Sequence, residues 1–126
     1  MQTMQQQRAK YALEKVTAAK DDSNINNKEY KSYASGLPAM IQMNGLGQAA
    51  AFYCSKGTGD KPEQKTYRAL YNLLSGWLNE PGQPYAGHDL LEGITHGEMH
   101  TYKLAQAESL ALLDWVKKFA RAYMGD

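Results

Sequence analysis

Apolar residues recur every three or four positions along much of the chain, which is the spacing of one face of an α-helix. In the first 20 residues the pattern comprises Ala9, Ala12, Leu13, Val16 and Ala19. The polar run 21–24 (Asp-Asp-Ser-Asn) consists of turn-forming residues and ends the pattern. The spacing therefore predicts an amphipathic helix over about residues 3–20.

The same spacing predicts further helices. One begins near residue 27 and ends before Gly45, with a kink or restart at Gly36 and Pro38, because proline disrupts helical hydrogen bonding. Others are predicted over about residues 46–56, 62–79, 88–96 and 101–123, and Pro62 suits a first helical turn. The predicted apolar stripe of the last helix comprises Leu104, Ala105, Leu112, Trp115, Val116, Phe119 and Tyr123.

Composition supports helices over strands. The chain has 2 Val, 3 Ile and 6 Thr against 16 Ala and 13 Leu, a balance that disfavours a β-sheet. With 126 residues it has the length of one domain, and its loops are too short to be domain linkers. We predict an all-α fold, a compact bundle of about five to seven helices forming a single domain over residues 1–126.

Several features indicate the cellular setting. Cys54 is the only cysteine, so no internal disulfide is possible, and a reducing compartment is the better fit. The N-terminus lacks the pattern of a signal peptide. The charge-free run 32–55 contains glycine, proline, asparagine and glutamine, so we do not read it as a membrane span. We expect a cytoplasmic protein with no membrane partner.

Residues 45–50 (Gly-Leu-Gly-Gln-Ala-Ala) match the G-x-G-x-x-A string of dinucleotide-binding proteins. That motif requires a strand leading into a tight turn at a helix N-terminus. Here a helical pattern precedes it, and no β–α–β spacing follows. We therefore interpret the string as a corner between two helices, with Gly47 allowing close packing, and predict no cofactor.

Glu92, His96 and His100 would share one face of a continuous helix, which is the geometry of a metal site. Gly97 interrupts that helix, and histidines near a helix C-terminus also interact favourably with the helix dipole. No serine or cysteine has a recognisable activating context. We therefore predict no metal and no catalytic residue, and keep a metal-dependent enzyme only as a minor alternative.

The net charge is only +1, from 14 basic and 13 acidic side chains, but the charges are unevenly distributed. Residues 80–100 contain four acidic residues and no Lys or Arg. Basic residues recur elsewhere at helical spacing, which suits a positive surface, although lysines on a solvated helix face are also routine. The basic groups are Arg8 and Lys15, then Lys61, Lys65 and Arg68, and finally Lys117, Lys118 and Arg121.

A helical wheel places Glu108 within the apolar stripe of the last helix. A carboxylate in that position must be paired or hydrogen-bonded. Arg8 borders the apolar face of the first helix, so we predict that it pairs with Glu108. Such a pair would be structural and would remove Arg8 from any RNA-contacting set.

The order of several short segments resembles the small helical subunit of the type III-B CRISPR effector, the Cmr complex that silences RNA. The resemblance covers nearly the whole chain. It rests on Gln7-Arg8-Ala9 with Ala12-Leu13, Leu37-Pro38 with Ile41, Asn44-Gly45-Leu46-Gly47-Gln48-Ala49, Ala51-Phe52, Ser55-Lys56 and Glu108-Ser109-Leu110-Ala111-Leu112-Leu113-Asp114-Trp115-Val116-Lys117-Lys118-Phe119-Ala120.

The resemblance implies a non-catalytic protein of antiviral defence. Its partners would be guide RNA, target RNA, the backbone subunits of the Cmr complex and copies of itself. The small subunits line the groove that holds guide RNA paired with target RNA, through sequence-independent basic contacts. The family's positive surface maps onto Arg8, Lys56, Lys117, Lys118 and Arg121, and the helical wheel adds Lys15, Lys61, Lys65 and Arg68.

The acidic segment would then suit a basic surface of a neighbouring subunit, and the alternative is an ordinary solvated surface. The alternative function is a cytosolic helical adaptor that binds protein partners only, which the low net charge favours.

Overall fold

A computed structural model describes residues 1–125, which form six α-helices and no β-strand. The helices are α1 (Met4–Lys20), α2 (Asn27–Asn44), α3 (Leu46–Lys56), α4 (Pro62–Leu78), α5 (Leu90–His96) and α6 (Met99–Tyr123). The prediction of an all-α bundle of five to seven helices is confirmed.

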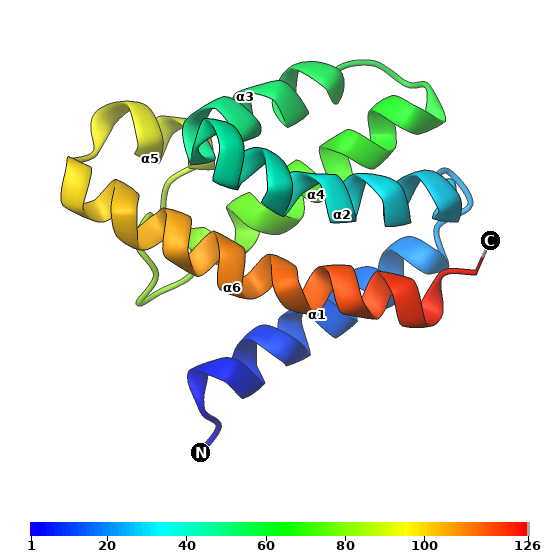
Figure 1. Cartoon of the computed structure of the whole chain (residues 1–126), viewed down its shortest axis with the longest axis horizontal. Coiled ribbons are helices and arrows are strands. Elements are labelled where there is room, and N and C mark those ends of the chain that lie inside the picture. Colours follow the sequence, from blue (N-terminus) through cyan, green and yellow to red (C-terminus); the bar gives the residue numbers. More distant parts are fainter. Residues whose placement is uncertain (126) are drawn as a thin grey trace.

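The longest helix, α6, runs the length of the bundle and packs against both α1 and α2 (Figure 1). Helix α2 runs in the opposite direction to α6, so the start of α2 and the end of α6 lie at the same end of the molecule (Figure 1). Helices α3 and α4 pack against each other and against α2, and α5 contacts both of them at the other end.

One hydrophobic core lies between these helices. Most of its largest fully buried side chains come from α2, α3, α4 and α6. Burying one leucine side chain stabilises the fold by roughly 2 kcal/mol. These side chains include Tyr30, Leu37, Ile41, Leu46, Leu70, Leu74, Leu112 and Leu113.

Some predicted boundaries are wrong. The restart expected at Gly36 and Pro38 does not occur, because α2 continues through Pro38 to Asn44. Leu37 and Ile41 on either side of Pro38 are fully buried, and their packing holds the helix despite the hydrogen bond that proline cannot make. Helix α5 begins at residue 90 rather than 88, and α6 begins at 99 rather than 101.

Some residues of the predicted apolar stripes are exposed. Leu104 is 51% exposed, and Leu13 and Tyr123 are also exposed. Because α1 and α2 contact α6 from two sides, its buried line follows Ala105, Leu112, Leu113, Val116 and Ala120, and Leu104 and Tyr123 fall outside it.

Glu108 joins three helices. Its carboxylate accepts hydrogen bonds from Nε and Nη2 of Arg8 on α1, the Nη2–Oε1 distance being 2.9 Å. It also accepts one from Nε1 of Trp77 on α4, at 2.9 Å. The side chains of Arg8 and Glu108 are 21% and 13% exposed. The predicted pair of Arg8 with Glu108 is confirmed.

The pKa of Glu108 reflects this environment. Burial by itself would raise the pKa of the carboxyl group, but hydrogen bonds from Arg8 and Trp77 and the charge of Arg8 outweigh it, so the pKa lies below its ordinary value. The same hydrogen bond raises the pKa of Arg8. Glu108 is therefore a carboxylate in the folded protein, and the three-helix joint depends on its charge.

Replacing Arg8 with alanine leaves the Glu108 carboxylate with only one strong donor. We expect the free energy of unfolding to fall by about 2 kcal/mol, because a largely buried charge loses its partner. Urea denaturation measures the loss. Lys10→Ala, an exposed position on the same helix, removes the same charge and serves as the control. Equal stability of the two variants would contradict the structural role of Arg8.

The contacts of Glu108 also predict that the stability of the fold depends on pH. The folded pKa of Glu108 is below its ordinary value of 4.5, so the carboxylate stabilises the fold above that pH. The contribution disappears as the pH falls through the folded pKa. Glu108→Gln should therefore destabilise the protein by about 1–2 kcal/mol at neutral pH and by progressively less below about pH 4. A stability difference that stays constant with pH would refute this.

Candidate RNA interface

The predicted corner at residues 45–50 is confirmed. Gly45 has a φ of +88°, a conformation that favours glycine. The N–H of Leu46 donates to Gln106 Oε1, and the N–H of Gly47 donates to the hydroxyl of Tyr102, both at 2.9 Å. A Cβ on Gly47 would lie 3.5 Å from Ile94. Side chains of α6 therefore occupy the amides that a nucleotide phosphate would need.

The metal hypothesis finds no support in residues 1–125, where no three His, Cys, Asp or Glu side chains are grouped to hold a metal ion. His88 Nδ1 lies 2.6 Å from the carboxylate of Glu92, and both side chains are more than half exposed. His96 Nδ1 lies 3.0 Å from the backbone carbonyl of Glu92. His100 lies on the next helix, beyond Gly97.

The acidic residues of segment 80–100 differ in their contacts. The carboxylate of Asp89 accepts hydrogen bonds from the hydroxyls of Tyr71 and Ser75, at 2.8 and 3.2 Å, which joins α4 to the start of α5. Burial and the hydrogen bond to Asp89 together raise the pKa of Tyr71. Glu92 and Glu98 are exposed on the end of the molecule that carries α5.

Two of the predicted basic residues have structural partners. Arg8 is paired with Glu108, as described above. Arg68 Nη1 donates to the carbonyl of Gly57 at 3.1 Å and so ties α4 to the end of α3. A Cβ on Gly57 would lie 2.9 Å from the backbone of Arg68, so the two helices approach closely there. Arg68 and Lys65 are half-buried, whereas Lys61 is exposed.

Three other predicted cations have local contacts. Lys15 Nζ lies 5.3 Å from the centre of the Tyr11 ring. Lys56 Nζ lies 5.6 Å from the centre of the Phe52 ring. Lys118 pairs with Asp114 at 3.0 Å, but both side chains are more than 60% exposed, so this pair contributes little stability.

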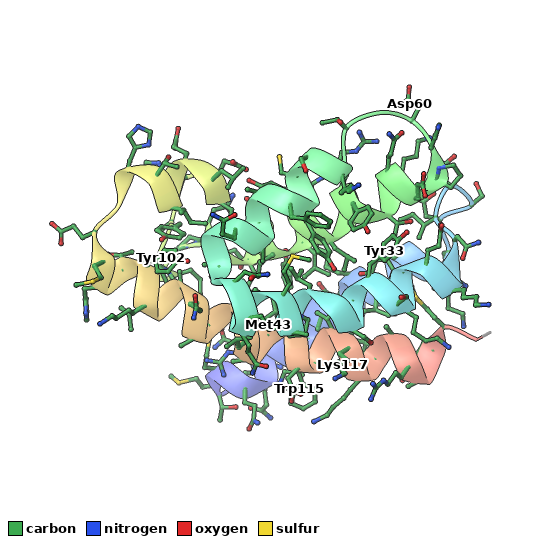
Figure 2. All side chains as sticks on the ribbon, turned by 45° about the horizontal axis from the view of Figure 1, so that its top comes forward. Tyr33, Met43, Asp60, Tyr102, Trp115 and Lys117 are labelled. Atoms are coloured by element: carbon green, nitrogen blue, oxygen red, sulfur yellow. The ribbon has the colours of Figure 1, made fainter. Side chains whose placement is uncertain are left out.

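The end of α6 carries the most concentrated positive charge. Arg121 lines an open cleft together with Lys28, Lys31, Ser32 and Ser35 of α2. Lys117 lies one turn before Arg121 on α6 (Figure 2). Lys28 and Lys31, the cations of α2, are not in the set predicted from the sequence. Their i, i+3 spacing was visible, but only the antiparallel packing of α2 on α6 places them beside Arg121.

No helix in residues 1–125 has the length and apolar character needed to span a membrane. Residues 4–123 match the model of the CRISPR-associated protein family Cas_Cmr5.

The chain belongs to the Cas_Cmr5 family. It is 33% identical over 122 residues to the CRISPR system Cmr subunit Cmr5 of Thermus thermophilus, covering 97% of this chain and 96% of that protein. The crystal structure of a CRISPR-associated Cmr5 family protein from the same organism superposes with a TM-score of 0.78 and 29% identity, covering 98% of this chain and 100% of that one. The resemblance found in the sequence is confirmed.

In this Cas_Cmr5 chain, we expect the hydrogen bond between Leu46 and Gln106 at the corner to stabilise the fold. Gln106→Ala removes the acceptor for the N–H of Leu46, a fully buried residue, at the start of α3. We expect a loss of about 1–2 kcal/mol in the free energy of unfolding. Gln42→Ala, at an exposed position of α2, is the matched control and should have little effect. A neutral Gln106→Ala would show that α3 needs no cap from α6.

Proposed function

We propose that this chain is the non-catalytic small subunit of a cytoplasmic type III-B CRISPR ribonucleoprotein effector that acts in antiviral defence. In this role it helps to line the groove that holds guide RNA paired with target RNA. The observation that carries the proposal is membership of the Cas_Cmr5 family over residues 4–123, together with a relative that is named as a Cmr subunit. Cleavage of the target belongs to other subunits.

Its contribution to RNA binding is electrostatic. In a guide-directed complex, base pairing reads the sequence, and protein cations bind the phosphates and recognise the shape of the duplex. Lysine and arginine side chains suffice for this role, and their contacts weaken steeply with salt. Lys117, Lys118 and Arg121 lie close together on the last turns of α6, and Lys118 and Arg121 are exposed.

The other predicted cations differ in their exposure and in the partners that they have within the fold. Arg8 is excluded, because two of its guanidinium nitrogens bind Glu108 inside the fold. Arg68 is a weaker candidate, since its guanidinium group is held by Gly57. Lys15, Lys56 and Lys61 are exposed and Lys65 is half-buried, so these four stay in the proposed set.

The charge distribution supports head-to-tail stacking of copies. Exposed Glu92 and Glu98 lie at the end of the bundle that carries α5, whereas Arg121 lies at the opposite end (Figure 1). Opposite charges on two ends of one chain favour a heterologous contact that repeats along an assembly. Hence the acidic end of one copy would meet a basic surface of its neighbour.

Reversing two charges on α6 tests the proposal. In a purified effector complex, Lys117→Glu with Lys118→Glu should weaken capture of labelled target RNA about tenfold at physiological salt, because phosphate contacts are replaced by repulsion. The control is Lys10→Glu with Lys103→Glu, which makes the same charge change at two exposed positions on α1 and α6.

The possible results lead to different conclusions. Unchanged capture by an intact complex would remove these lysines from the RNA surface. Purification of the tagged chain with protein partners and without short guide RNAs would favour the alternative, an adaptor that binds only protein.

A further inference from the structure

The start of α2 and the end of α6 enclose an open cleft of about 370 Å³. Its lining consists of three cationic side chains, Lys28, Lys31 and Arg121, and of the two hydroxyl side chains of Ser32 and Ser35. Glu29, the acidic residue in the first turn of α2, is not among the lining residues. The cleft thus collects positive charge from two helices whose sequences are about 90 residues apart.

Such a concentration of like charge favours an anionic ligand. The positive charges of Lys28 and Arg121 repel each other across the cleft, and a bound anion relieves that repulsion. The chain has a net charge of only +1, so this grouping is not a consequence of a generally basic protein. Lys28 and Arg121 are both exposed, so a ligand can reach them from solvent.

The kinds of donor in the cleft match a phosphate group. The guanidinium group of Arg121 can donate two parallel hydrogen bonds to one phosphate, and a lysine ammonium adds a compact charge. Hydroxyl groups of serine are common additional donors to phosphate oxygens in nucleic-acid complexes. Ser32 and Ser35 lie one turn apart on α2, on the side that faces the cleft.

The shape favours a chain of phosphates over a single small anion. The lining residues of α2 extend from position 28 to position 35, which is roughly 10 Å along the helix axis. The cleft is open to solvent, and Lys117 continues the positive charge along α6 by one further turn. The length and openness of the cleft between α2 and α6 therefore suit an extended strand.

We propose that the cleft between α2 and α6 binds phosphates of an RNA strand, with Lys28 and Arg121 as the two cations that grip it from opposite helices. Ser32 and Ser35 add neutral hydrogen bonds to the same phosphates. This inference rests on the proposed function and assigns part of the RNA contact to α2, where the sequence pattern had placed none.

The test uses the assembled effector complex and a labelled target RNA complementary to its guide. For Lys28→Ala with Arg121→Ala, we expect the Kd to rise about tenfold near physiological salt. The slope of log K against log salt should become shallower by about two, because two phosphate contacts are lost. Lys10→Ala with Lys103→Ala removes the same charge elsewhere and should change neither value.

Replacing the two serines tests the contribution of neutral hydrogen bonds to binding separately from the contribution of charge. Ser32→Ala with Ser35→Ala should weaken binding by a smaller factor and leave the salt slope unchanged, because neutral donors release no counterions. Thermal unfolding of the isolated subunit verifies that each variant folds.

The proposal fails if the Lys28/Arg121 variant is incorporated normally and keeps both the affinity and the salt slope. It also fails if that variant is lost from the complex, because the cleft would then be a contact with a neighbouring protein. The Lys117→Glu/Lys118→Glu complex in the same assay separates the two hypotheses. If that complex alone captures less RNA, only the cleft is wrong. If neither variant affects capture, the proposed RNA contact is wrong as well.

Discussion

The bundle depends on one charged group in its interior, the carboxylate of Glu108. An isolated carboxylate in that position would oppose folding, so the surrounding helices must supply donors. Arg8 from α1 and Trp77 from α4 do so, and their hydrogen bonds overcome the effect of burial on the carboxyl pKa. Because the donors come from different helices, satisfying one charge fixes the positions of α1, α4 and α6 together. Apolar packing alone would define these positions less uniquely.

Glu108 is one of several polar joints on α6. Near its start, Tyr102 and Gln106 accept hydrogen bonds from the amides at the beginning of α3, so the first turns of α6 supply the acceptors that α3 needs. Near its end, Arg121 faces the start of α2 across an open cleft. The proposed RNA-binding cleft thus includes part of the helix that organises the fold. A change that displaced α6 would disturb the core and the basic cleft at once.

The features that could be predicted from the sequence are those that depend on the local pattern of residues. Helical spacing and the shortage of β-branched residues were sufficient for the fold class, and the position of Glu108 in an apolar stripe was sufficient to find its partner. The features that could not be predicted depend on how the helices pack against one another. Pro38 stays inside α2 because buried neighbours on both sides hold the helix, and no local pattern shows that burial. Lys28 could not be recognised as part of a basic cleft before α2 was placed against α6.

The structure also shows how a chain of net charge +1 uses its charged side chains. Part of its positive charge stabilises the fold, as in Arg8 and Arg68, and part of its negative charge does so as well, as in Asp89 and Glu108. The remaining charges are mixed at the end that carries Arg121, where Asp21 and Asp22 line a hollow together with Lys28, whereas the exposed Glu92 and Glu98 lie at the other end. With so small a net charge, long-range attraction of RNA to the free chain is weak. Under the proposed function, placement beside an already bound guide would supply a high effective concentration, so that a few well-positioned cations would be enough.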